Sequence, residues 1–123
     1  MICTSWSALG PQYSALFSGL EQAGFPCEVE NYRPDVFGNF VALCSSPKSR
    51  VRITSDRGQI FVDVASLSGP WIDKEAILES IGISRERHET IHGLWSGYDP
   101  AVQGSELERY LPNLIAAVSN DVA

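Results

Sequence analysis

The feature that most constrains the fold is a central segment, residues 27–65, in which apolar and polar side chains alternate. Alternation with a period of two is typical of β-strands that bury one face. Turn-forming sequences divide the segment into four runs, which we expect to be strands at residues 27–32, 40–44, 50–54 and 60–65. Because the connections between them are short, the pattern predicts an antiparallel meander.

The last predicted hairpin can pair in two registers. A loop at residues 55–58 sets Arg50 opposite Asp63, whereas a two-residue Arg57-Gly58 loop sets Arg52 opposite Asp63. Both registers have the same parity, so both give one apolar face and one charge-paired face. The sequence therefore predicts a half-buried sheet and leaves the register open.

Helical periodicity flanks this segment on its N-terminal side. Apolar residues recur at helical spacing, and Gly24 is placed to end the helix so that Phe25 folds back onto Leu20. The residues that form the apolar face are Trp6, Leu9, Tyr13, Leu16, Phe17 and Leu20.

Further helices are predicted after the sheet. Asp73 is placed to cap one that ends at Gly82, and a capping box at Ser105 to Glu108 predicts the start of the last. Pro112 is expected to kink that last helix or to split it. With a short helix near residues 84–93, the order is α-β-β-β-β-α-α-α. We expect a single α+β domain over residues 1–123: a four-stranded antiparallel meander with the N- and C-terminal helices packed on one face.

Charge and composition bear on the kind of partner and on the cellular compartment. The chain has 123 residues and a net charge of −6, which disfavours nucleic acid as a partner. No apolar run approaches the ~20 residues that cross a membrane. The first basic residue is Arg33 and Gly10-Pro11 interrupts the N-terminal segment, so a secretory signal is not predicted. We expect a cytoplasmic protein.

Three cysteines, Cys3, Cys27 and Cys44, lack the close spacing of a metal site. An odd number cannot pair completely, and the expectation is buried, reduced thiols.

The only two histidines spell a zinc-hydrolase motif, His88-Glu89-Thr90-Ile91-His92. On a helix, His88 and His92 would project from one face as zinc ligands, with Glu89 as general base. The candidates for a third ligand are Asp99, Glu106 and Glu108. However, a charged run, 84–87, precedes the motif and Gly93 follows it, which is typical of a short surface helix. We therefore expect no metal and no catalytic residue, and keep the zinc site as the alternative.

Two exposed segments are candidates for partner binding. Asp56-Arg57-Gly58 is a turn sequence, and Arg57 at its tip is a candidate contact residue. A glycine-containing aromatic loop before the last helix adds Trp95, Tyr98 and Asp99.

Three motifs in the middle third of the chain carry a family resemblance: Phe37-Gly38-Asn39 at a strand start, Asp56-Arg57-Gly58-Gln59 at a hairpin and Trp71-Ile72-Asp73 at a helix start. In this order they resemble motifs of small bacterial proteins that look like toxin-neutralising immunity proteins. The resemblance implies a small, acidic, non-catalytic α+β protein and names no binding residue. Small secretion chaperones, which are acidic, α+β and usually dimeric, are also similar.

We therefore expect a cofactor-free protein-binding module, an immunity-type inhibitor of a toxin or effector domain, whose partner is a basic, toxin-like domain. The alternatives are a small zinc-dependent hydrolase and an acidic secretion chaperone.

Overall fold

The computed structural model describes residues 6–83 and 98–120. Two short 3-10 helices precede the first α-helix, five strands follow, and two further α-helices complete the described chain. Their bounds are η1 Trp6–Leu9, η2 Pro11–Tyr13, α1 Ser14–Gln22, β1 Cys27–Arg33, β2 Asn39–Ser45, β3 Ser49–Asp56, β4 Gln59–Ser66, β5 Ile72–Asp73, α2 Lys74–Ser80 and α3 Pro100–Asn120.

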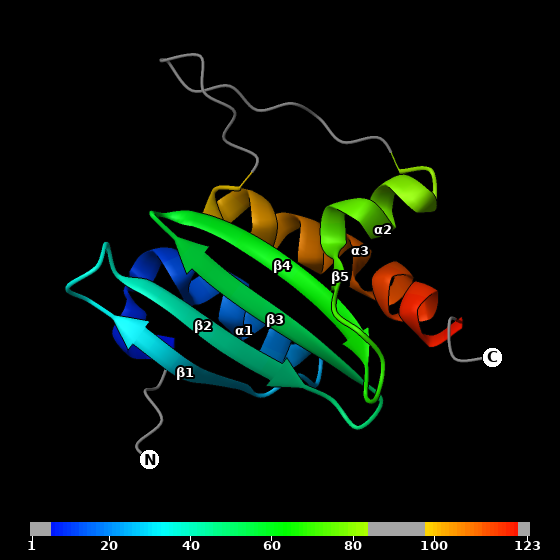
Figure 1. The fold of residues 1–123 in the computed structure, drawn as a ribbon, viewed down its shortest axis with the longest axis horizontal. Coiled ribbons are helices and arrows are strands. Elements are labelled where there is room, and N and C mark those ends of the chain that lie inside the picture. The colour runs from blue at the N-terminus through cyan, green and yellow to red at the C-terminus, as the bar shows by residue number, and fades with distance from the viewer. Residues whose placement is uncertain (1–5, 84–97, 121–123) are drawn as a thin grey trace.

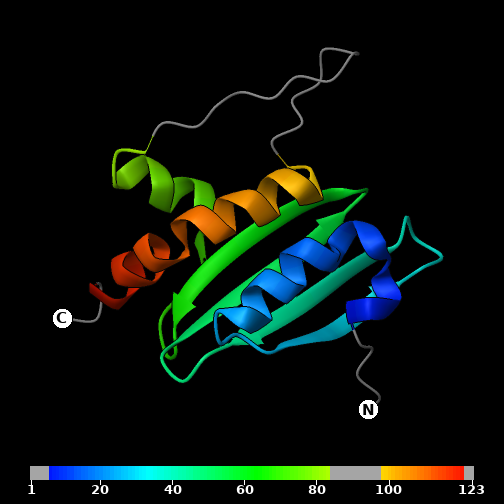
Figure 2. The ribbon, with the colours of Figure 1, turned by 180° about the vertical axis from the view of Figure 1, so that it is seen from behind.

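The five strands form one antiparallel sheet in the order β1-β2-β3-β4-β5. Helices α1 and α3 lie side by side across one face of it, and α2 lies beside α3 near β5 (Figures 1 and 2). The predicted α+β class and antiparallel meander are thus confirmed. The sheet has one strand more than predicted, because Ile72 and Asp73 pair with the edge of β4 before the chain turns into α2.

The core lies between the helices and one face of the sheet. Period-two alternation places Ala42, Ile53 and Val62 in one cross-strand row on that face, and all three are buried. From the helical side, Phe17 and Leu114 are both fully buried. The side chains at the intervening positions of β2, β3 and β4 point to the opposite face, which we call the open face. They are mostly half-buried and include both polar and apolar residues.

The β3–β4 hairpin has the two-residue loop. Arg52 pairs with Asp63, and its Nη2 lies 2.9 Å from the Asp63 Oδ2 on the open face. The hairpin therefore adopts the register that follows from an Arg57-Gly58 loop, with Arg52 opposite Asp63.

Two helices end as their sequences predict. In α1 the Phe25 N–H donates to the Leu20 carbonyl at 2.9 Å, and Gly24 has a φ of 92°. In α2 the Ile83 N–H donates to the Leu78 carbonyl at 3.0 Å in the same way. These are Schellman caps, in which a glycine with positive φ lets the chain turn back over the last helical turn.

The last helix begins earlier than predicted. Helix α3 starts at Pro100 rather than at Ser105, because Asp99 accepts a hydrogen bond from the Ala101 N–H at 2.8 Å and proline suits the first helical position. Pro112 lies inside α3 without splitting it. The buried faces of Leu111 and Leu114 hold the helix against the core on both sides of the proline. The short helix predicted near 84–93 lies outside the described residues.

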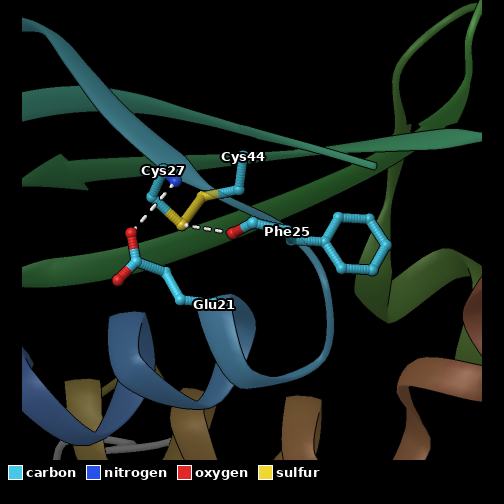
Figure 3. The surroundings of a disulfide bond; sticks show 4 residues. All are labelled: Glu21, Phe25, Cys27 and Cys44. Carbon is cyan, nitrogen blue, oxygen red and sulfur yellow. Dashed lines mark hydrogen bonds between the residues drawn. A yellow bond between two sulfur atoms is a disulfide. The ribbon is translucent and has the colours of Figure 1, made fainter. Parts of the chain in front are cut away.

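The expectation of reduced thiols is wrong for two of the three cysteines. Cys27 and Cys44 form a disulfide between β1 and β2, next to the C-terminal end of α1 (Figure 3). They face each other directly across the strand pair, with their Cα atoms 4.0 Å apart. The backbone N–H of Cys27 also donates to the Glu21 carboxylate at 3.5 Å. Cys3 lies outside the described residues.

We expect loss of this disulfide to lower the free energy of unfolding by about 3 kcal/mol, because the bond closes a loop with a sequence separation of 17. Urea unfolding of Cys27→Ser/Cys44→Ser against the oxidised wild type measures the difference, with Cys3→Ser as the control that leaves the pair intact. Equal stability in all three proteins would contradict the assignment.

Candidate functional site

Two turns at the same end of the sheet have the same unusual conformation. In the β1–β2 connection, Phe37 and Gly38 have φ values of 55° and 68°, and the Asn39 N–H donates to the Val36 carbonyl at 2.9 Å. In the β3–β4 hairpin, Arg57 and Gly58 have φ values of 54° and 82°. Positive φ at both central residues is the signature of a type I′ turn.

Large side chains are costly at the first central position of such a turn, where asparagine, aspartate and glycine are preferred. A left-handed conformation costs a non-glycine residue about 1–2 kcal/mol. Phe37 and Arg57 are the only non-glycine residues with positive φ in the part of the chain that the structure describes. Strain of this kind gathers at functional sites when neighbouring structure maintains it.

The two strained residues contact each other. The guanidinium carbon of Arg57 lies 5.8 Å from the centre of the Phe37 ring, which is within the range of a cation–π contact. The Arg57 N–H also donates to the Asn39 side-chain oxygen at 2.9 Å, which ties one turn to the other. Phe37 is nevertheless 74% exposed, the most exposed large hydrophobic residue among those described, and Val36 beside it is exposed too.

A charge pair at the start of the first turn braces it. The Arg33 guanidinium donates two hydrogen bonds to the Asp35 carboxylate, at 3.3 and 3.2 Å. These bonds, followed by one from the aspartate's own backbone, lower the pKa of the Asp35 carboxyl from its ordinary value. Asp35 therefore stays charged at neutral pH, and the pair remains exposed to solvent.

Beside the turns the open face is hollowed into a shallow depression of about 220 Å³. Its lining comes from β1, β2 and β3 and mixes the polar residues Asn31, Arg33 and Thr54 with the apolar residues Phe40 and Val41. We call this depression together with Val36, Phe37 and Arg57 the tip surface. An exposed aromatic ring and an arginine next to a hollow of mixed polarity have the composition of a protein-binding hot spot.

The structure places the predicted partner-binding residues in different environments. Arg57 belongs to the tip surface. The Tyr98 ring packs on Phe61 with 4.7 Å between centres, and its carbonyl accepts a hydrogen bond from the Ile60 N–H at 2.7 Å. Asp99 caps α3, as described above. Tyr98 and Asp99 therefore have structural roles, and Trp95 lies outside the described residues.

The candidate metal ligands are not brought together in the described part of the chain. The Glu106 carboxylate lies 2.7 Å from the ammonium group of Lys74, which is fully buried. Glu108 is two positions further along α3, so it projects about 200° around the helix from Glu106. Residues 6–83 and 98–120 contain no group of three His, Cys, Asp or Glu residues that could hold a metal ion. His88, Glu89 and His92 lie outside the described residues.

Two arginines of the β3–β4 hairpin, Arg50 and Arg52, contact other residues of the chain away from the tip surface. The guanidinium groups of Arg50 and Arg52 lie 4.6 and 4.7 Å from the centre of the Trp71 ring. Arg50 also donates to the carbonyl oxygens of Ser66 and Gly69. These contacts leave Arg57 as the arginine of the hairpin that reaches the tip.

Sequence reasoning assigned Phe37 to the start of a strand and so missed it as a contact residue. The usable signal was that the two turn sequences share one pattern. In both Val36-Phe37-Gly38-Asn39 and Asp56-Arg57-Gly58-Gln59, a large side chain stands at the second position and a glycine at the third. A glycine at the second central position is what a type I′ turn demands.

Relief of the strain at Arg57 gives a prediction. We expect Arg57→Asn to raise the free energy of unfolding by about 0.5–1 kcal/mol, because asparagine tolerates a positive φ and only a weak, exposed cation–π contact is lost. Urea unfolding tests this, with Lys48→Asn as a control that removes an exposed cation elsewhere. A clear loss of stability in Arg57→Asn alone would show that the turn is unstrained.

No membrane-spanning candidate occurs among the helices of the described residues. Comparison with known proteins found no family model, no curated protein and no solved structure that matches this chain.

Proposed function

We propose that this protein binds another protein through the tip surface and inhibits it, as an immunity-type inhibitor of a toxin or effector domain, without catalysing a reaction. The observation that carries the proposal is the contact between Phe37 and Arg57. Both residues occupy costly backbone conformations, and together they present an exposed aromatic ring and a cation to solvent. Aromatic and arginine side chains dominate binding energy at protein interfaces.

The charge of the chain favours a basic partner. With a net charge of −6, the protein attracts a cationic domain and speeds its association. Glu28 and Glu30 are exposed on β1, an edge strand that also lines the tip surface, and the charged Asp35 immediately precedes Val36 of that surface. Exposed carboxylates of this kind act mainly on the association rate and lose their effect as salt rises.

The first experiment is to co-express the chain with the protein encoded by the adjacent gene and to purify the complex. We expect an equimolar complex whose association slows with added salt. If the neighbouring product is not a toxin-like domain and no complex forms, the proposal fails.

A small zinc-dependent hydrolase is the alternative that the motif at residues 88–92 favours. Metal analysis of the purified protein separates the two functions. We expect a zinc content far below one ion per chain, unchanged in His88→Ala/His92→Ala. About one zinc per chain that is lost in this double variant would favour the hydrolase.

The mass of the protein in solution tests the chaperone alternative, and the redox state of Cys27 and Cys44 in cells tests the compartment. An acidic secretion chaperone would be a dimer, whereas we expect a monomeric mass in solution. We propose the cytoplasm as the compartment, where cellular reductants would open the Cys27–Cys44 disulfide that the structure contains. Trapping of free thiols in intact cells tests this, since a fully oxidised pair would indicate an oxidising compartment.

A further inference from the structure

On the helical layer, away from the open face, an apolar groove of about 660 Å³ runs between α1 and α3. Buried side chains, among them Leu20, Phe25 and Leu111, form its floor. The exposed residues along its walls include Gly19 and Ala116, which are small. Figure 2 shows the two helices from this side, close at their N-terminal ends and splayed apart towards the C-terminal end of α1.

The narrow end of the groove is set by a glycine. A Cβ atom at Gly104 of α3 would lie 3.4 Å from the Cα of Leu16 in α1, so the two backbones approach closely there. The groove follows α3 from Gly104 to Ala116, a length of about 18 Å at 1.5 Å per residue. That length accommodates about three turns of a third helix.

The polar groups at the groove are electronegative. Glu108 lines it with an exposed carboxylate, and Pro112, which also lines it, has no N–H to donate to the Glu108 carbonyl. The C-terminal end of α1 contributes Gln22 and Ala23, and the last turn of α1 contains no basic residue that would offset the negative pole of the helix. Among residues 6–83 and 98–120, no lysine or arginine lines the groove.

We infer that this groove binds an amphipathic α-helix of a partner protein that carries a lysine or arginine beside its apolar face. The apolar floor fits the apolar face of such a helix, and the cation meets the exposed carboxylate of Glu108. A second copy of this chain is a poorer occupant, because it brings the same net charge of −6 and a second Glu108. The groove lies on the opposite side of the sheet from the depression of the tip surface, so this inference does not rest on the proposed function.

The test uses helical peptides of about 15 residues, or about four turns. One contains only leucine and lysine with the leucines on one face, a second has glutamate in place of lysine, and a third has the leucine–lysine composition in scrambled order. Binding to the full-length protein is followed by NMR chemical-shift changes. We expect shifts in α1 and α3 with the amphipathic leucine–lysine peptide, and at least tenfold weaker binding of the other two.

Gly19 offers a matched pair of variants. A Cβ atom at Gly19 meets nothing within 4 Å, and alanine and leucine both favour helix more than glycine does, so both variants should fold. Gly19→Leu places its side chain in the groove and should abolish binding, whereas Gly19→Ala should retain it. Glu108→Gln should weaken binding about tenfold, while Glu79→Gln, an exposed carboxylate on α2, should leave it unchanged.

Equal binding by Gly19→Leu and Gly19→Ala, or by the lysine and glutamate peptides, would overturn the inference. So would a dimer that dissociates when Gly19→Leu is introduced, because a second copy would then fill the groove. Phe37→Ala should not alter peptide binding, so failure at the tip surface and failure at the groove are distinguishable.

Discussion

Replacement of Lys74 with alanine is expected to lower the free energy of unfolding by about 3–5 kcal/mol. The Lys74 ammonium is fully buried and lies 2.7 Å from the carboxylates of both Glu75 and Glu106. These two side chains are only 16% and 15% exposed. Removing the cation leaves two poorly solvated negative charges close together, and it breaks a link between the start of α2 and the middle of α3.

Urea unfolding measures this loss, with Lys48→Ala as the control because Lys48 is exposed and its removal should change stability by no more than about 0.5 kcal/mol. The double variant Lys74→Met/Glu106→Gln should recover part of the loss, since it removes the cation together with one of its carboxylates. A loss below about 1 kcal/mol in Lys74→Ala would show that the buried ion pairs contribute little.

Truncation of Phe37 to alanine is expected to weaken partner binding by about thirtyfold or more, equivalent to at least 2 kcal/mol. The ring is 74% exposed in the free protein and can become buried only when a partner covers it. Stability should change little, because the ring packs mainly against the exposed Arg57. Isothermal titration of the purified complex gives the affinity, and urea unfolding of the free variant gives the stability.

Leu67 is the matched control for Phe37. It is also a large exposed hydrophobic residue, at 54%, but it follows β4 at the opposite end of the sheet from the two turns. Leu67→Ala should therefore bind the partner with unchanged affinity. If Phe37→Ala and Leu67→Ala lose affinity equally, or neither does, the tip surface is not the binding site.

Local patterns predicted much of the fold. The alternation over residues 27–65 specified four strands and their buried face, because a period of two leaves a single way to hide the apolar side chains. The caps at Gly24 and Gly82 were predictable for the same local reason, since each depends on a glycine and the hydrophobic residue that follows it.

Features that depend on distant residues were not predictable in the same way. The Cys27–Cys44 disulfide follows from the β1–β2 register, which spacing alone does not reveal. The pairing of β5 depends on the free edge of β4.

The start of the last helix was mispredicted for a different reason. Two local signals competed, and the capping box at Ser105 was preferred over the Asp99-Pro100 start that the chain adopts.

The candidate site was predicted in part. Arg57 was identified from its turn, but Phe37 was taken for a strand residue, and the contact between them joins turns 20 positions apart in the sequence (57 − 37). Glu106 was a candidate metal ligand in the sequence. In the structure its carboxylate is paired with Lys74 instead. That ion pair joins positions 32 apart, which no local pattern indicates.

The most direct test of the central claim, inhibition through the tip surface, is a growth assay. Cells that produce the neighbouring gene's product alone should stop growing, and co-production of the wild-type chain should restore growth. Phe37→Ala/Arg57→Asn should fold and accumulate normally and yet fail to restore growth, whereas Leu67→Ala should restore it fully. Full rescue by Phe37→Ala/Arg57→Asn would contradict a role for the tip surface, and no rescue by the wild type would contradict inhibition itself.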